Sequence, residues 1–254
     1  MEESKDLYNN SELRGNVISW IPFEKEDRVL EIGGEAGAIT NALVGLCAGV
    51  DSVECDETLA KASEEKFKDV KNVCCLHGRL DEMEEKLQPE YDAVVISGAL
   101  KYADRYAANA QELLELSVKK LKKNGRLILI AENKYGLKYF AGAREKYMKG
   151  LYSTLEGYDE KEGVVLYSKR AMTDMLERAG ITSYKVYYPY PDYVYTSEVY
   201  SDDYLPKEGS LNDNLWNLDE DRLMVFDESK AFDQIIKDGL FDMFANSFLI
   251  IGQI

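Results

Sequence analysis

Histidine is nearly missing from this sequence, and its scarcity removes one large class of sites. His77 is the single histidine among 254 residues, so a histidine-rich metal centre is excluded and we predict no metal site. The same scarcity restricts the choice of general base to a carboxylate or a tyrosine, because His77 is expected at the end of a strand.

Cysteine is rare as well, and its spacing gives no sign of metal or redox chemistry. Cys47, Cys55, Cys74 and Cys75 form no C-x-x-C pair, and three of them lie in apolar runs typical of strands. We therefore interpret them as small buried thiols in a reducing cytoplasm.

Positive charge and long apolar runs are also lacking. The 31 Lys and Arg residues face 47 Asp and Glu residues, which gives a formal net charge of −16. Such a field repels polyanions and disfavours a nucleic-acid partner. No N-terminal basic and apolar signal and no apolar run of about 20 residues is present, so the sequence predicts neither export nor a membrane span, and a cytoplasmic protein is expected.

The length and composition suit one folded domain. The chain is 45% hydrophobic and shows no internal repeat, low-complexity tract or linker, so we expect a single domain over residues 1–254. Ile254 directly follows a predicted strand, which leaves a longer polypeptide open as an alternative.

Apolar runs of strand length alternate with segments of helical spacing along the chain. This alternation predicts an α/β fold with a doubly wound, seven-stranded, mostly parallel sheet. Strands are expected at residues 28–33, 51–56, 72–78, 91–98, 126–133, 183–190 and 247–254. Helices are expected at residues 11–21, from about residue 39 to 46, and at 57–70, 82–87, 107–125 and 168–179, the last with Ser168 as its N-cap.

Two long insertions interrupt the alternation, at about residues 134–167 and 189–246. Both are rich in Tyr and Asp and leave the sheet near the edge where ligands bind in such folds, so we expect them to form a lid or a substrate platform. Their tyrosines, in the runs "KYGLKYF" and "YKVYYPYPDYVY", fit two interpretations equally: ordinary packing, or an aromatic-lined cleft for a sugar.

The segment "VLEIGGEAGAIT" passes from a strand through three glycines into a helix. A dinucleotide site needs G-x-G-x-x-G, so that two phosphates can approach the backbone. Starting from Gly33, the second and third glycine positions are held by Glu35 and Ala38. A bulky anion at the middle position disfavours a dinucleotide by charge and by shape.

A ligand that joins one carboxylate and one ammonium to a nucleoside fits this turn better. Free N–H groups at the start of the helix suit the carboxylate, and Glu31 or Glu35 suits the ammonium. Glu54 ends the next strand, where an acid customarily accepts the ribose hydroxyls. The expected cofactor is S-adenosylmethionine, with S-adenosylhomocysteine as its product.

At these residues the sequence resembles the class I S-adenosylmethionine-dependent methyltransferases, whose first motif reads roughly E/D-x-G-x-G-x-G. "EIGGEAG" matches it at Glu31, Gly33 and Gly37, with Glu35 in place of the middle glycine. "SELRGNVISWI", "YDAVVISGALKYA", "AENKYGLKYFAGA", "YPYPDY" and "FANSFLI" further resemble methyltransferase domains found beside or fused to glycosyltransferases in bacterial surface-polysaccharide gene clusters.

The resemblance implies a role for several residues at the cofactor. Gly33, Gly34 and Gly37 would cradle the methionine part, and Glu54, with the adjacent Cys55, would hold the ribose. Arg79 and Leu80 would border the adenine, and Ser97 and Gly98 would face the sulfonium.

Two charged residues near the turn, Arg14 and Glu31, each fit two interpretations. Arg14, with Tyr8 close by in sequence, could pair with a carboxylate of the cofactor or lie on a solvated helix face. Glu31 fits either a role near the ammonium or that of a buried acid satisfied by backbone donors.

Methyl transfer from a sulfonium is a direct displacement, so alignment of the acceptor matters most. An alcohol acceptor must also lose a proton, and Glu132 and Asp192 are the candidate bases. The Asn-Pro-Pro-Tyr signature of many amino methylases is replaced by "AENK", which favours oxygen of a sugar, a glycan precursor or a related small acceptor.

Two other functions stay open. Glu35, Arg79 and the segment "REKY" at residues 144–147 depart from the family pattern, which allows a non-catalytic module that binds a glycosyltransferase partner. A nucleotide-dependent oxidoreductase would require a different reading of the glycine turn.

Overall fold

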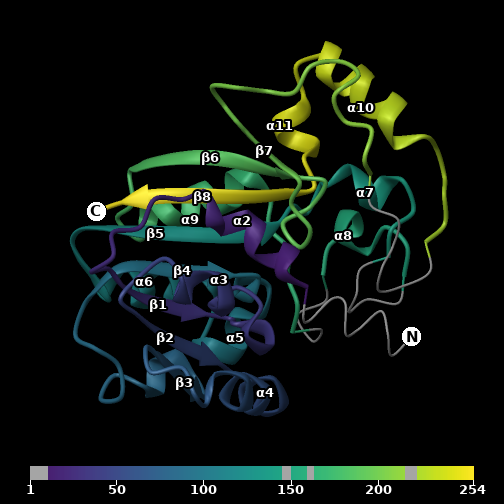
Figure 1. Cartoon of the computed structure of the whole chain (residues 1–254). Helices are drawn as coiled ribbons and strands as arrows, with labels where there is room; N and C mark the ends of the chain where they lie inside the picture. The colour runs from purple at the N-terminus through teal and green to yellow at the C-terminus, as the bar shows by residue number, and fades with distance from the viewer. Residues whose placement is uncertain (1–10, 145–149, 159–162, 215–221) are drawn as a thin grey trace.

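The chain folds around one mixed β-sheet (Figure 1). The structure, a computed structural model, describes residues 11–144, 150–158, 163–214 and 222–254. Within these residues eight strands form the sheet, in the order β3-β2-β1-β4-β5-β8-β6-β7. Their bounds are β1 Arg28–Ile32, β2 Gly49–Glu54, β3 Val73–His77, β4 Tyr91–Ser97, β5 Leu121–Glu132, β6 Ser183–Tyr190, β7 Glu198–Ser201 and β8 Ser247–Gln253.

The strand directions confirm the doubly wound, mostly parallel arrangement. β1 pairs in parallel with β2 and β4, while β3 and β5 extend the parallel part on either side. β8 runs antiparallel between β5 and β6. The sheet gains one strand beyond the seven expected, because β7, from within the second insertion, pairs antiparallel with β6 at the edge. Strand order reverses at β1 and β4, so ligands are expected beside the carboxyl ends of these two strands.

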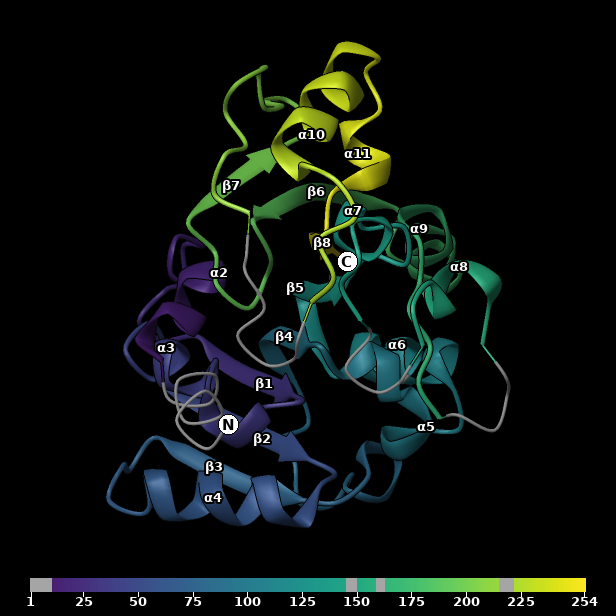
Figure 2. The same ribbon diagram turned by 90° about the vertical axis from the view of Figure 1, so that its right-hand side faces the viewer.

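Helices cover both faces of the sheet. Their bounds, with η for a 3-10 helix, are η1 Glu12–Gly15, α2 Asn16–Ser19, η2 Glu35–Gly37, α3 Thr40–Val44, α4 Glu57–Phe67, η3 Leu80–Glu82, η4 Ala99–Tyr102, α5 Ala103–Tyr106, α6 Ala110–Lys119, α7 Leu137–Phe140, α8 Ser153–Glu156, α9 Lys169–Arg178, α10 Glu228–Lys237 and α11 Phe241–Phe244. Figure 2 shows α2 and α3 on one side of the sheet and α6 and α9 on the other.

Alternation within the strands supplies a hydrophobic core on each face. In β1, Leu30 and Ile32 join the core beneath α6 and α9, whereas Val29 joins the core beneath α2 and α3. Leu129 and Ile130 in β5 divide in the same way. Strands that are buried on both faces therefore appear in the sequence as continuous apolar runs.

The predicted helix at 168–179 is confirmed together with its cap. α9 begins after Ser168, whose side chain accepts a hydrogen bond from the N–H of Ala171. Met172, Met175 and Leu176 form its buried face, as their spacing predicts.

Three predicted helices differ from the structure. Residues 82–87 form no α-helix: η3 ends at Glu82 and turns follow, because so short a segment hardly repays helix nucleation. Helix α6 covers Ala110–Lys119, and β5 begins at Leu121, where it pairs with Tyr91 instead of continuing the helix to Gly125. At the N-terminus, η1 and α2 together stop at Ser19.

The two insertions gather at the carboxyl ends of the parallel strands. Figure 1 shows α7, α8, α10 and α11 at the right-hand end of the sheet, and this end faces the viewer in Figure 2. Buried aromatic rings join the second insertion to the sheet: Tyr188 packs edge-on against Phe241 and Phe248, with ring centroids 5.5 and 6.0 Å apart.

Candidate active site

The candidate residues converge on the carboxyl edge of the sheet. Gly33 follows β1, Glu54 ends β2, Gly98 follows β4 and Glu132 ends β5. Because β1 lies between β2 and β4, the loop after β1 is flanked by Glu54 on one side and by Gly98 on the other. This edge is therefore the candidate site.

The three glycines of the loop are required for packing against the protein itself. Gly33 and Gly37 have φ angles of 83° and 77°, which L side chains rarely adopt. A Cβ atom would lie 2.7 Å from the Ala99 Cβ at Gly33 and 2.3 Å from a ring carbon of Phe67 at Gly37. The loop is thus pressed against η4 and α4, and this fixes its path.

The acidic residue within the loop adopts an unusual conformation. Glu35 and Ala36 have φ angles of 43° and 59°, in the left-handed region that disfavours residues with a Cβ atom. The backbone N–H of Glu35 donates to Oε2 of Glu54, 3.2 Å away. The loop is therefore tied to the end of β2 at the residue where the methyltransferase motif has its middle glycine.

Arg14 lies in the site and not on a solvated helix face. Its side chain is 0% exposed, and its guanidinium pairs with the carboxylate of Glu35. The structure thus brings together two residues that are 21 positions apart in sequence. Tyr8, which the sequence associates with Arg14, lies outside the described residues.

Glu54 is buried in a set of hydrogen-bond donors. Its Oε1 accepts bonds from the N–H of Asp56 and from the hydroxyl of Tyr106, both at 3.0 Å. The thiol of Cys55 lies 3.6 Å from the same oxygen, and burial raises its pKa to about 11. These donors hold the carboxylate in one orientation, and burial favours the protonated form of Cys55.

Glu31 lies beneath the loop. Its side chain is fully buried and accepts a hydrogen bond from the hydroxyl of Thr40. Burial, reinforced by the charges of Glu54 and Glu35, outweighs the hydrogen bonds of Thr40 and Ser52 and raises its pKa to about 7. A Cβ atom at Gly34 would lie 2.6 Å from Oγ of Ser52, so this polar cluster lies directly under the glycines.

Arg79 and Leu80 occupy the end of β3 in different ways. The Arg79 guanidinium forms a two-pronged pair with Asp81, at 3.0 and 2.7 Å, and also donates to the carbonyl of Asp104. Leu80 is 4% exposed, and its side chain belongs to the core. Arg79 thus joins the loop after β3 to α5, and Leu80 can offer a ligand little beyond its backbone.

Ser97 and Gly98 form the end of β4. Gly98 has a φ angle of 64°, and its N–H donates to Ile130. Ser97 is 1% exposed, and its hydroxyl has no hydrogen-bond partner among the described residues. A buried hydroxyl in this state is a candidate for contact with a ligand.

The candidate base Glu132 is held in an ion pair. Its Oε1 lies 3.1 Å from Nζ of Lys101, and its Oε2 accepts a hydrogen bond from Tyr139 at 2.7 Å. Burial by itself would raise its pKa, but the charges of Lys101 and Lys138 hold the pKa well below its usual range.

Asp192 is held in a similar way on the second insertion. It pairs with Lys138 and accepts hydrogen bonds from the Ser247 hydroxyl and the N–H of Val194. Burial by itself would lower the pKa of Lys138, but the charges of Asp192 and Glu132 raise it. The two candidate bases thus belong to one buried, charge-balanced group.

Asn133 and Asn246 connect both insertions at this edge. The amide of Asn133 donates to the carbonyls of Met243 and Ala245, both at 2.7 Å. The amide of Asn246 donates to the carbonyl of Pro191 and accepts from the N–H of Lys138, both at 3.0 Å. The segments "AENK", "YPYPDY" and "FANS" therefore meet in the structure.

The structure adds residues that the sequence did not single out. Tyr106 holds Glu54, Lys101 holds Glu132, and the buried Tyr193 hydroxyl lies 3.5 Å from Lys101. Their signal in the sequence is weak, since a lysine inside the apolar segment "SGALKYA" is the one oddity. Of the tyrosines in the runs "KYGLKYF" and "YKVYYPYPDYVY", Tyr139, Tyr188, Tyr190 and Tyr193 are at most 4% exposed, so packing is the correct interpretation for them.

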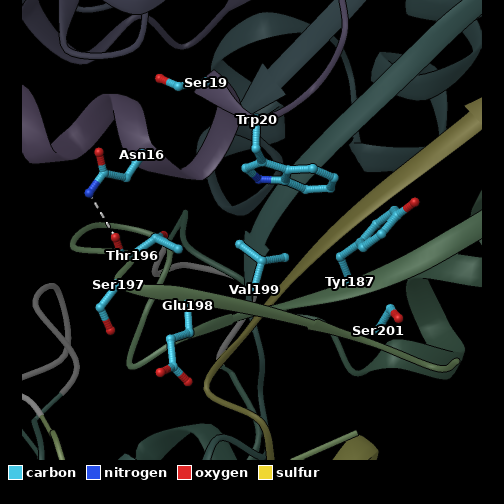
Figure 3. A pocket seen from close by; sticks show the side chains of 9 residues that line it. All are labelled: Asn16, Ser19, Trp20, Tyr187, Thr196, Ser197, Glu198, Val199 and Ser201. Atoms are coloured by element: carbon cyan, nitrogen blue, oxygen red, sulfur yellow. Dashed lines mark hydrogen bonds between the residues drawn. The ribbon is translucent and has the colours of Figure 1, made fainter. Parts of the chain in front are cut away.

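A separate surface groove of about 630 Å³ lies between α2 and the strands β6 and β7 (Figure 3). Trp20 and Tyr187 meet edge to face in it, with ring centroids 4.9 Å apart. Polar side chains surround them, and the amide of Asn16 donates to the carbonyl of Thr196.

In the described part of the chain, no helix is long and apolar enough to cross a membrane, and no cluster of metal-ligating side chains occurs.

No protein-family model and no curated protein matches this sequence, whereas solved structures do. A SAM-dependent methyltransferase from Archaeoglobus fulgidus superposes with a TM-score of 0.60 at 19% identity, over 98% of this chain and 97% of that one. A Thermotoga maritima SAM-dependent methyltransferase, a possible histamine N-methyltransferase, gives 0.58 at 17% identity, over 99% and 93%. The complex between the Haloferax volcanii Trm112 methyltransferase activator and the putative methyltransferase gives 0.59 at 13% identity, over 99% and 93%. The chain therefore has the fold of the SAM-dependent methyltransferases.

Proposed function

We propose that the protein is an S-adenosylmethionine-dependent methyltransferase. The observation that carries this proposal is the placement of a glycine loop at the strand-order reversal with a buried, pre-oriented carboxylate, Glu54, at the end of the next strand. This is the arrangement in which the fold binds a nucleoside. The SAM-dependent methyltransferases that share the fold support the same cofactor.

The residues present fit that cofactor. Glu54 would accept the ribose hydroxyls, and the loop of Gly33, Gly34 and Gly37 would cradle the methionine part. Ser97 and Gly98, at the end of β4, would face the sulfonium, and the buried Ser97 hydroxyl retains hydrogen-bonding capacity. When bound, S-adenosylmethionine supplies an electrophilic methyl group.

The remaining cofactor contacts in the proposal come from the neighbouring strand ends. Arg79 and Leu80 would border the adenine, with Cys55 beside the ribose. Glu31 would act beneath the loop, where its carboxyl lies under Gly34. Burial raises its pKa to about 7, and a cationic ligand nearby would favour its charged form.

For the acceptor we propose an oxygen of a sugar, a glycan precursor or a related small molecule, with Glu132 or Asp192 taking its proton. The charges of Lys101 and Lys138 lower the pKa of Glu132 and make this carboxylate a weak base. Direct displacement from a sulfonium depends mainly on alignment, so a weak base is compatible with the reaction. The insertions would then serve as the substrate platform.

One observation favours a second candidate function, a non-catalytic module that binds a glycosyltransferase. The carboxylate of Glu35 lies against Gly98, since a Cβ atom there would be 3.1 Å from its Oε1. A protein side chain thus occupies the edge at which the cofactor would bind.

Calorimetric titration with S-adenosylmethionine and S-adenosylhomocysteine tests the proposal, with NAD as a comparison ligand. Micromolar binding of both sulfur nucleosides, without binding of NAD, is the expected result. Binding of NAD alone would indicate an oxidoreductase, and failure of all three would favour the partner-binding module.

The acceptor is tested by incubating the protein with S-adenosylmethionine and a panel of sugars and sugar nucleotides, and measuring the S-adenosylhomocysteine released. We expect E132Q and D192N to lower turnover more than cofactor affinity. Unchanged turnover in both variants would remove the two carboxylates from the proposed chemistry.

A further inference from the structure

Glu35 is fixed by its backbone so that its side chain points across the site. Its positive φ is maintained by the bond from its own N–H to Glu54 and by the N–H of Gly37, which donates to Gly34 at 2.8 Å. The conformation disfavours a side chain at this position by about 1 kcal/mol. A glycine would adopt it freely, so the presence of an acid here needs a compensating interaction.

Arg14 supplies that interaction from a position that cannot move far. It precedes Gly15, where a Cβ atom would lie 2.9 Å from the Ala42 Cβ, so η1 is packed tightly against α3. The Arg14 side chain is 0% exposed. A buried guanidinium without a counter-charge is strongly destabilising, and Glu35 provides a counter-charge.

The pair lies where the far end of a loop-bound nucleoside would reach. Glu35 contacts Glu54 through its backbone, while its carboxylate lies beside Gly98 and the hydroxyl of Tyr193. A ligand whose ribose is held by Glu54 and which crosses the loop toward the end of β4 would bring its remaining charged groups to the Arg14–Glu35 pair.

We propose that Arg14 is the carboxylate-binding residue of this loop and that Glu35 is an internal occupant, which the carboxylate of the incoming ligand displaces. The identity of the ligand rests on the proposed function, since S-adenosylmethionine and S-adenosylhomocysteine both carry an α-carboxylate. Guanidinium and carboxylate match in charge and in two-pronged geometry whichever carboxylate is bound. Glu35 thereby keeps Arg14 paired in the free protein and lowers the affinity for carboxylate-bearing ligands.

This competition discriminates between two nucleosides. S-adenosylhomocysteine has the carboxylate, whereas 5′-methylthioadenosine has the same nucleoside and sulfur without the amino-acid part. If Glu35 leaves Arg14 in about one free molecule in ten, the apparent affinity of a ligand that binds only this open state is weakened about tenfold. We expect Glu35→Gln to tighten binding of S-adenosylhomocysteine by about tenfold or more and to change binding of 5′-methylthioadenosine by less than about twofold.

Glu12→Gln is the matched control for this calorimetric experiment. Glu12 is exposed on η1, two positions from Arg14, and its substitution changes the net charge by the same amount. Equal tightening by E12Q and E35Q would show a long-range charge effect and overturn the proposal. Equal tightening of both nucleosides by E35Q would overturn it as well.

A second experiment tests the Arg14 site without any nucleoside. In Glu35→Gly, formate should occupy the vacated position and raise the midpoint of thermal unfolding by a few degrees relative to chloride at equal ionic strength, while the native protein and R14M/E35G should show no such difference. Formate-specific stabilisation in E35G without binding of either nucleoside would support the Arg14 carboxylate site and reject the proposed cofactor. If both nucleosides bind but formate has no effect and E35Q tightens neither nucleoside selectively, the proposed cofactor is supported and the role of Glu35 is rejected.

Discussion

The two halves of the carboxyl edge hold their acids by different means. On the β1 and β2 half, Glu54 and Glu31 accept hydrogen bonds from neutral donors such as Tyr106 and Thr40, while Glu35 pairs with Arg14. On the β5 and β6 half, Glu132 and Asp192 each pair with a lysine. Among the described residues, the first half therefore has acids that pair with no lysine or arginine, and a cationic ligand can compensate their charge, whereas both candidate bases of the second half pair with a lysine. A sulfonium nucleoside would thus be drawn to the glycine loop, with the acceptor beside the balanced half.

The largest effect is expected from breaking the balance of the second half. Lys101→Met leaves the buried Glu132 carboxylate without its nearest counter-ion, and such a loss lowers the free energy of unfolding by about 3–5 kcal/mol. Chemical denaturation measures it. Lys61→Met is the matched control, since Lys61 pairs with Glu57 while 70% exposed and should cost less than about 1 kcal/mol. Equal losses in the two variants would contradict the comparison, and partial recovery in K101M/E132Q would support it.

Removing Glu54, the acid proposed to hold the ribose, should act mainly on the ligand. Glu54→Ala deletes the acceptor proposed for two hydroxyls and should weaken binding of S-adenosylhomocysteine by about 100-fold. Calorimetry measures the change, and Glu57→Ala, at an exposed residue of α4, serves as the control. Retained affinity in a folded E54A protein would place the ribose elsewhere.

The acid beneath the loop should make stability depend on pH. Because the pKa of Glu31 is raised to about 7 by burial, the native state binds more protons than the unfolded state between about pH 4.5 and 7, and the free energy of unfolding falls as the pH rises through this interval. Gln stays neutral, so Glu31→Gln should be about 3 kcal/mol more stable than the native protein at pH 8, and the gain should shrink toward pH 4.5. Denaturation at both pH values measures the gain. A gain that is the same at both would exclude titration of Glu31 as its cause.

The smallest effect is expected at the end of β3. The Arg79 and Asp81 side chains are 33% and 28% exposed, and partly solvated pairs contribute at most about 1 kcal/mol. Arg79→Ala should therefore change the midpoint of thermal unfolding little. Its effect on nucleoside affinity is the informative measurement, because a loss in affinity without a loss in stability would support the proposed place of Arg79 at the adenine.

Much of the fold could be predicted from the sequence because it depends on local patterns. Apolar runs marked the strands, and Ser168 with the spacing of Met172 and Leu176 marked α9. β7 escaped prediction because "EVYS" is a four-residue edge strand, whose pairing with β6 is set by tertiary contacts and not by its own pattern.

Site residues at strand ends could be predicted from the sequence, whereas contacts between side chains of different elements could not. Gly33, Glu54 and Gly98 could be placed from their order along the chain, since parallel strands end at one edge. The partners of Arg14 and Glu132 could not be assigned, because 21 and 31 positions separate these residues from Glu35 and Lys101. Sequence spacing does not specify which buried charges will meet across loops.

The bonds of Asn133 and Asn246 have a mechanical consequence. Asn133 directly precedes the first insertion and donates hydrogen bonds to the end of the second. Asn246 ends the second insertion and forms hydrogen bonds with Pro191 and Lys138. The two insertions are therefore anchored at one place, and movement of either away from the sheet would break hydrogen bonds to the other. Any opening of this edge to admit an acceptor would involve a concerted movement of both insertions.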